Sequence, residues 1–299
     1  MSRDIPRKTQ LRAALAAVIL ASLGFLAPVA AEAPAAVRGG YLAGAAGCEQ
    51  CHTDARNGGR PYAGGRALET PYGTVFTPNI TPDRETGIGR WQMADFEQAL
   101  RWGIAPDGSH YLPAFPFPFY NRLTHEDLDD LKTFLDGLSA VSQVNRTAGP
   151  TLFSAARAAI TVVAEHFPGP WRPDATKNAA WNRGAYLVAT IGRCSDCHTP
   201  RDWLGAPEPA RLLAGIPAGP GRKAVPNITP DLENGIGRWS IEDIVILLRD
   251  GQTPDFDFVG GAMAEIVRNT SRFTDDDRRA IAVYLRSLPA VHFRAKVNQ

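Results

Sequence analysis

Two short runs of the chain combine side chains that can bind and hold a redox-active metal. Both follow the pattern Cys-x-x-Cys-His and use all four cysteines of the chain: Cys48, Cys51 and His52, then Cys194, Cys197 and His198. This pattern is typical of haem attachment, because each thiol forms a thioether with one haem vinyl group and the adjacent imidazole binds the iron. The sequence therefore predicts two covalently bound haem c groups, with His52 and His198 as axial ligands.

Other uses of four cysteines fit this pattern less well. Two disulfides are an option for an exported chain, but a disulfide does not require a histidine directly after each cysteine pair. A zinc site with four cysteines has suitable spacing within each pair, yet the two pairs lie 146 residues apart. A thioredoxin-like Cys-x-x-Cys motif would not be followed by histidine twice.

The two motifs belong to an internal repeat that covers most of the chain. Arg-Gly-x-Tyr-Leu precedes each haem motif, at residues 38–42 and 183–187. Pro-Asn-Ile-Thr-Pro-Asp occurs at 78–83 and 226–231, and Gly-Ile-Gly-Arg-Trp at 87–91 and 235–239, with the same offset of 148. The chain therefore consists of two similar halves, each with one haem motif.

Each half has the sequence pattern of a small, mainly helical domain. After each Gly-Ile-Gly-Arg-Trp run, a helical pattern stops at a glycine, Gly103 or Gly251, and a final helix begins at Thr124 or Thr274. Residues 32–140 are the expected first domain and 181–299 the second. Residues 141–180 join them, and their apolar spacing predicts a packed helical strap between the domains.

The first 31 residues resemble a secretory signal peptide. Four basic residues precede an alanine-rich apolar stretch, and small residues then offer a cleavage site. An uncleaved membrane anchor is the alternative, and a peripheral association with the membrane would also be compatible. Cleavage removes four positive charges and one negative charge, so the formal charge changes from +1 to −2. The absence of a basic surplus argues against nucleic acid as a partner.

The second axial ligand is expected to differ between the two haems. Met263 follows two glycines in a loop before the last helix, and a thioether is a common sixth ligand of cytochrome iron. The offset of 148 places Phe115 at the equivalent position of the first half, and phenylalanine cannot bind iron. His110 in the same loop is the first candidate for haem 1, ahead of His125 and Met93, and a five-coordinate haem is the alternative.

This difference has a predicted redox consequence. Ligation by a thioether raises the reduction potential of a haem, whereas a second imidazole usually lowers it. We therefore expect haem 1 to have the lower potential and haem 2 the higher one, so that electrons enter through the first half and leave through the second.

The combined motifs resemble those of a known family, the dihaem and trihaem cytochrome c subunits of bacterial periplasmic or membrane-bound dehydrogenases. Alcohol, gluconate, fructose and nicotinate dehydrogenases have such subunits. The resemblance rests on residues 181–188, on both copies of the two repeated runs and on Tyr-Leu-Pro-Ala-Phe-Pro at 111–116. It implies two tandem class I cytochrome c domains, with His52 and His198 proximal and Met263 distal. The chain departs from the family pattern in two ways. Many relatives have methionine where this chain has Phe115, and some carry a third haem.

The resemblance implies an electron-transfer protein with no substrate of its own. The expected donor is a dehydrogenase subunit with a flavin, quinone or molybdenum cofactor, and the expected acceptor is a quinone, another cytochrome or an oxidase. The expected location is the periplasm. A dihaem enzyme, peroxidase-like or thiosulfate-oxidising, with an open haem 1 is the alternative, because Phe115 leaves that iron without an obvious sixth ligand.

Overall fold

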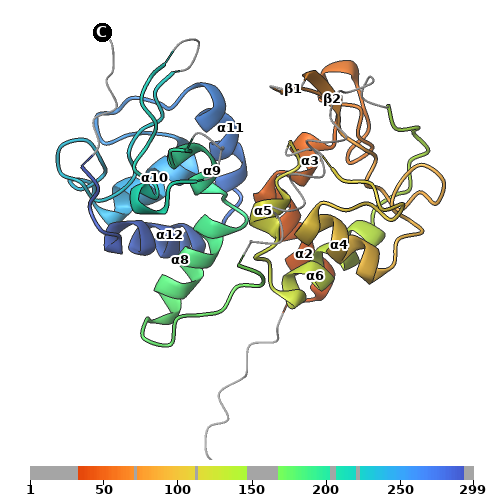
Figure 1. The fold of residues 1–299 in the computed structure, drawn as a ribbon, viewed down its shortest axis with the longest axis horizontal. Helices are drawn as coiled ribbons and strands as arrows, with labels where there is room; N and C mark the ends of the chain where they lie inside the picture. Colours follow the sequence, from red (N-terminus) through yellow and green to blue (C-terminus); the bar gives the residue numbers. More distant parts are fainter. Residues whose placement is uncertain are drawn as a thin grey trace, which may run out of the picture. The chain divides into compact units, whose positions relative to one another are not determined.

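The computed structural model describes residues 33–70, 73–111, 114–146, 168–202, 207–219 and 223–292 (Figure 1). It is mainly helical in this part of the chain, as the sequence predicts. The first half contains α2 (Ala35–Ala46), α3 (Cys48–Cys51), a short 3-10 helix at Ala55–Asn57, the hairpin of β1 (Ala67–Thr70) and β2 (Gly73–Phe76), α4 (Met93–Trp102), α5 (Phe117–Tyr120) and α6 (His125–Asp136). The second half contains α8 (Ala179–Ala189), α9 (Cys194–His198), a 3-10 helix at Pro209–Arg211, α10 (Ile241–Asp250), α11 (Gly261–Thr270) and α12 (Asp275–Ser287).

The helices of the two halves correspond in order, as expected for a repeat. α2 and α3 match α8 and α9, α4 matches α10, α5 matches α11, and α6 matches α12. The predicted ends are confirmed, because α4 and α10 end at Gly103 and Gly251, both in the left-handed region that favours glycine. Thr124 and Thr274 cap α6 and α12 by accepting hydrogen bonds from backbone amides three residues later.

The first and last helices of each half cross at a glycine. A Cβ atom on Gly39 of α2 would lie 1.9 Å from the carbonyl oxygen of Asp130 in α6, and one on Gly184 of α8 would lie 1.9 Å from the carbonyl oxygen of Ala280 in α12. Only glycine allows the two backbones to approach this closely. The repeated Arg-Gly-x-Tyr-Leu run therefore fixes the helix crossing behind each haem motif.

Replacing Gly184 by alanine is expected to destabilise the protein by about 1–3 kcal/mol, the usual cost of overpacking a core, or more because the added carbon meets backbone. Chemical unfolding followed by circular dichroism measures this free energy. Gly40→Ala is the matched control, because alanine stands at the equivalent position 185 of the second half. Equal losses for the two variants would contradict the close crossing at Gly184.

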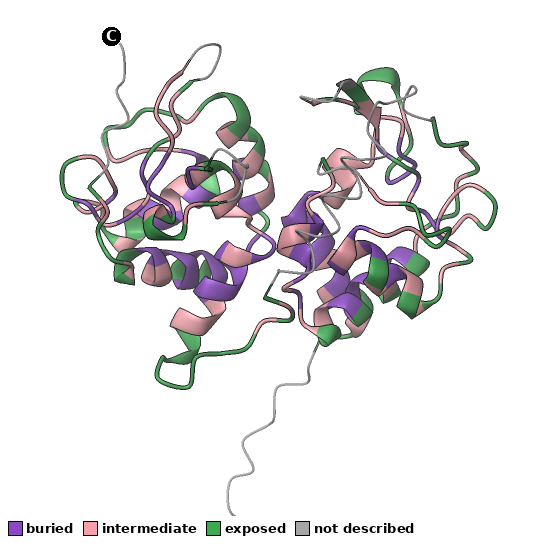
Figure 2. Cartoon of the chain, viewed as in Figure 1, coloured by how far each residue is buried: buried purple, intermediate pink, exposed green. Residues whose placement is uncertain are grey.

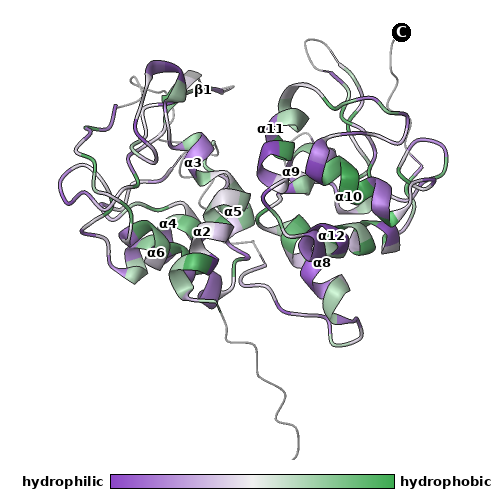
Figure 3. Cartoon of the chain, turned by 180° about the vertical axis from the view of Figure 1, so that it is seen from behind, coloured by the Kyte–Doolittle hydropathy of each residue, from purple (hydrophilic) through white to green (hydrophobic). Residues whose placement is uncertain are grey.

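Figure 2 shows buried residues in the helices of both halves. Most of the buried apolar side chains of both halves belong to one cluster. In α10, for example, Ile244, Val245 and Leu248 are buried, and this helix is among the most hydrophobic segments in Figure 3. The described residues from Ala35 onwards belong to one compact unit. The mainly helical fold class is thus confirmed, whereas the division into two tandem domains stays a prediction.

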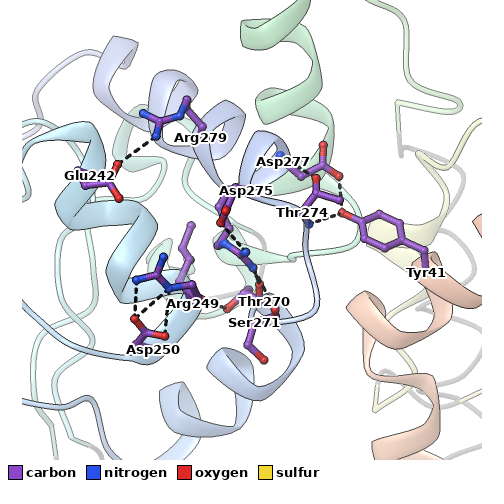
Figure 4. A network of polar contacts seen from close by, with 12 residues as sticks. Tyr41, Glu242, Arg249, Asp250, Thr270, Ser271, Thr274, Asp275, Asp277 and Arg279 are labelled. Atoms are coloured by element: carbon purple, nitrogen blue, oxygen red, sulfur yellow. Dashed lines mark hydrogen bonds and ion pairs between the residues drawn. The ribbon is translucent and has the colours of Figure 1, made fainter. Parts of the chain in front are cut away.

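Two tyrosines, one from each half, cap the first turn of the other half's last helix. The Tyr41 hydroxyl donates to Asp277 Oδ2 at 2.5 Å and accepts from the Thr274 amide at 3.2 Å (Figure 4). In the reciprocal contact, the Tyr186 hydroxyl donates to the Asp127 carboxylate and accepts from the Thr124 amide. The two contacts are equivalent under the repeat, so each half contributes a tyrosine to the start of the other half's last helix.

Burial raises the pKa of the Tyr41 hydroxyl to about 12, and the hydrogen bond to Asp277 acts in the same direction. Burial is also the main reason why the pKa of Tyr186 lies above its ordinary value. Both hydroxyls therefore stay protonated as donors near neutral pH.

The expected strap between the halves is described at its two ends. Gly169 donates its amide to the Asn121 side chain at 2.8 Å, and the Trp171 amide donates to the Arg122 carbonyl at 2.9 Å. The Arg122 guanidinium also lies over the Trp171 ring, 4.7 Å from its centre. These contacts hold the C-terminal end of the strap, at Gly169 and Trp171, against the first half. The apolar helix expected at 152–167 and the signal peptide expected at 1–31 lie outside the described residues.

None of the described helices has the length and apolar character that crossing a membrane requires.

Candidate haem-attachment sites

Both cysteine pairs lie on short helices that present their sulfur atoms on one face. Cys48 and Cys51 begin and end α3, and Cys194 and Cys197 lie on α9. Residues three apart on a helix are neighbours on its surface, so both thiols of a pair can face the same porphyrin edge. All four thiols are free, which disagrees with the disulfide alternative.

The histidine of each motif is held in one orientation by a backbone carbonyl. His52 Nδ1 lies 2.8 Å from the Pro78 carbonyl oxygen, and His198 Nδ1 lies 2.8 Å from that of Pro226. A carbonyl can only accept, so Nδ1 carries the proton and Nε2 keeps its lone pair for a metal. Histidine ligands of metals are commonly oriented in this way, by a hydrogen bond from the ring nitrogen that does not bind the metal.

The repeated Pro-Asn-Ile-Thr-Pro-Asp run positions these carbonyls. In the first half, the Asn79 side chain accepts from the Thr81 amide at 2.9 Å and donates to the Val141 carbonyl at 2.8 Å. In the second half, Asn227 makes the same bonds to Thr229 and Val291, both at 2.8 Å. The sequence shows this run as a repeat but not its role, and the signal available was its similar separation from the two motifs, with the prolines 26 and 28 residues after the histidines.

Burial lowers the pKa of the His52 and His198 imidazoles and outweighs the opposing hydrogen bonds to the carbonyls. Both rings are therefore neutral near pH 7, as an iron ligand must be. Burial also raises the pKa of the Cys48 and Cys194 thiols to about 12, so both are protonated in the chain itself.

This donor set fits a haem. Each site offers two thiols on one helical face, a neutral imidazole with Nε2 available, and a carbonyl that fixes the ring. When bound, the haem supplies one-electron chemistry, which no amino-acid side chain of the site provides. A zinc site would need several ligands at one point, and among the described residues no three His, Cys, Asp or Glu side chains gather in that way.

The structure supports the register that makes Phe115 equivalent to Met263. Ile104 and His110 form an isolated bridge in the first half, and Gln252 and Phe258 form one at an offset of 148 in the second half. The backbone bonds on either side of these bridges also correspond, from Tyr111 to Gly103 at 2.7 Å and from Val259 to Gly251 at 2.9 Å. The two loops thus follow the same path as far as Tyr111 and Val259.

The two distal positions differ in their surroundings. Met263 is half-buried in the first turn of α11. Phe115 is half-buried in an aromatic cluster, with its ring centre 5.5 Å from that of Tyr111 and 5.9 Å from that of Tyr120. The first half therefore places a hydrocarbon ring where the second places a potential sulfur ligand, and Met263 as an iron ligand stays a prediction.

The other residues considered as ligands of haem 1 occupy different places. His110 is half-buried, and its counterpart Phe258 is 70% exposed. His125 lies at the start of α6 with its side chain 71% exposed and its Nδ1 3.2 Å from Glu97, so it faces solvent. Met93 begins α4 and packs against the core. His110 stays the candidate sixth ligand of the first site.

No family model matches the chain, but several characterised proteins are similar to it over most of its length. A "Diheme cytochrome c-type" protein of Cereibacter sphaeroides is 42% identical over 260 residues, which cover 86% of both chains. The "Fructose dehydrogenase cytochrome subunit" of Gluconobacter japonicus is 41% identical over 270 residues, which cover 88% of this chain and 54% of that protein. The "Alcohol dehydrogenase (quinone), cytochrome c subunit" of Gluconobacter oxydans is 36% identical over 290 residues, which cover 92% of this chain and 60% of that protein.

The chain thus spans the greater part of the first relative and about half to three fifths of the two dehydrogenase subunits. The first relative matches almost end to end at an identity that establishes common descent, and its name agrees with the two haem motifs found here. The chain belongs to the family of dihaem c-type cytochromes that includes the cytochrome subunits of bacterial dehydrogenases.

Proposed function

We propose that the chain is an exported electron-transfer subunit that binds one haem c covalently at each Cys-x-x-Cys-His motif and serves a dehydrogenase. Cys48, Cys51 and His52 would hold the first haem, and the equivalent residues of the second half would hold the second. The observation that carries this proposal is the identical support of His52 and His198 by the carbonyls of Pro78 and Pro226, both at 2.8 Å. Because this contact is present in both halves, each half has an imidazole whose Nε2 can bind a metal.

Within this function, the direction of electron flow follows from the distal positions. Met263 can provide a sulfur ligand in the second half, whereas Phe115 cannot provide one in the first, where His110 is the candidate ligand. A sulfur ligand favours the reduced state more than an imidazole does. Electrons would therefore enter at the first half from a flavin, quinone or molybdenum-containing subunit and leave from the second half towards the respiratory chain.

The printed names of the relatives support a dehydrogenase as the partner, since three kinds of dehydrogenase cytochrome subunit, for fructose, alcohol and gluconate, resemble the chain at 35–41% identity. The proposed location is the periplasm, where the signal peptide expected at residues 1–31 would deliver the chain.

A redox titration of the purified, exported protein tests the proposal. We expect two one-electron steps with different midpoint potentials, and electron paramagnetic resonance should assign the lower potential to the haem without sulfur ligation. Phe115→Met is expected to raise the lower potential, because it offers the first haem the ligand found in the second half. Optical spectra before and after each titration show whether both haems remain low-spin.

Two equal potentials would contradict the proposed direction of electron flow. A high-spin haem whose spectrum shifts with cyanide or peroxide would support the dihaem enzyme instead. Absence of covalently bound porphyrin from the exported protein would contradict the whole proposal.

A further inference from the structure

The residue before the first cysteine of each motif adopts a left-handed backbone conformation. In the first half this residue is Gly47, with φ of 74°, whereas in the second half it is Arg193, with φ of 47°. A residue with a Cβ atom is uncommon in this region, and glycine would adopt it without strain. The second half therefore keeps an arginine at a position where the backbone favours glycine, which suggests that the side chain itself has a role.

The Arg193 side chain extends into the contact between the halves. Only 22% of it is exposed, and its Nε atom is buried without a hydrogen-bond partner in the described part of the chain. Its guanidinium lies near Cys197 of its own motif, near Cys51 of the first motif and near Tyr120, which is buried. One positive charge thus lies near both haem-attachment sites.

The nearest carboxylate does not cancel this charge. Arg193 Nη1 lies 3.9 Å from Asp196 Oδ2, but Arg201 Nη2 lies only 2.7 Å from Asp196 Oδ1. Arg193 therefore shares this carboxylate with Arg201, which lies closer to it. An arginine stays protonated at every accessible pH, so the charge is permanent.

We infer that Arg193 holds a fixed positive charge between the two haem-attachment sites and thereby raises the reduction potentials of both haems. The inference rests on the proposed attachment of haem at both motifs. Reduction adds one negative charge to a haem, and a nearby cation stabilises the product more than the reactant. Because the side chain is largely buried, solvent screens this interaction less than it would at the surface.

Arg193→Gly in the haem-loaded protein tests the inference. The substitution reproduces Gly47 of the first half and suits the backbone, so the fold is expected to be retained. We expect the equilibrium constant for reduction to fall at least threefold at both haems, where a tenfold change corresponds to 59 mV for a one-electron couple. Potentiometric titration followed by electron paramagnetic resonance measures each haem separately.

Two further variants separate charge from packing. Arg193→Lys keeps the charge and is expected to retain most of both potentials. Arg201→Gln removes the positive charge on the other side of Asp196. The Arg201 side chain is 39% exposed, and its loss is expected to lower the reduction potential of haem 2 only. A change of side-chain size at residue 193 that keeps the charge should therefore have little effect on the reduction potentials. Loss of the charge at residue 193 should lower the potentials of both haems.

The outcomes distinguish this inference from the proposed function. If Arg193→Gly binds two haems with unchanged optical spectra but leaves the potential of haem 1 unaltered, the inference is wrong while the proposed function stands. A fall as large in Arg193→Lys as in Arg193→Gly would also overturn it. Lack of covalent haem in the parent protein would instead refute the proposed function.

Discussion

Replacing Met263 with histidine is expected to lower the midpoint potential of haem 2 by roughly 0.1–0.3 V, a fraction of the ~0.8 V range over which axial ligands set haem potentials. The reason is that the variant exchanges a thioether for an imidazole, which favours the oxidised iron. Met263 lies in the first turn of α11 at the position equivalent to Phe115, so only the second site should respond. Redox titration measures the shift, and loss of the absorption band typical of sulfur–iron ligation should accompany it.

Met93→Leu is the matched control, because Met93 packs against the core at the start of α4 and is not expected to bind iron. This variant should leave both potentials and the sulfur–iron band unchanged. Loss of the band in Met93→Leu, or its retention in Met263→His, would show that Met263 is not the ligand. His110→Ala extends the series to the first site, where conversion of a low-spin to a high-spin spectrum is expected if the imidazole binds haem 1.

Replacing Cys194 and Cys197 together with alanine is expected to reduce the covalently bound haem from two groups to one. Without either thioether, the second haem has no covalent bond to the chain, and His198 alone binds it weakly. Mass spectrometry of the exported protein should show the mass of one porphyrin, and the absorbance per chain should fall by about half. The second half should also lose stability, because a small domain has little apolar core without its cofactor.

The equivalent double variant of Cys48 and Cys51 should lose the other haem, so that the two variants together assign the spectra and potentials of the two sites. The single variant Cys197→Ala is the control, since Cys194 can still form one thioether and retain the haem. A double variant that keeps two covalent haems would contradict attachment at its motif. Loss of both haems from one double variant would contradict independent loading of the halves.

The sequence by itself determined the chemistry of the two sites and the repeat that contains them. Cys-x-x-Cys-His places two thiols and an imidazole within five residues, so neither the ligands nor their spacing depends on the rest of the fold. The helix ends at Gly103 and Gly251 and the caps at Thr124 and Thr274 were also predictable, because capping depends on neighbouring residues.

Only the tertiary structure showed what supports the sites and how the halves meet. The carbonyls of Pro78 and Pro226 lie 26 and 28 residues from the histidines that they orient, and a carbonyl has no sequence signature of its own. The bond from Tyr41 to Asp277 joins residues 236 positions apart, and the approach of Arg193 to the first haem motif likewise depends on the packing of the two halves. Such contacts arise from the mutual packing of both halves, which local residue patterns do not specify.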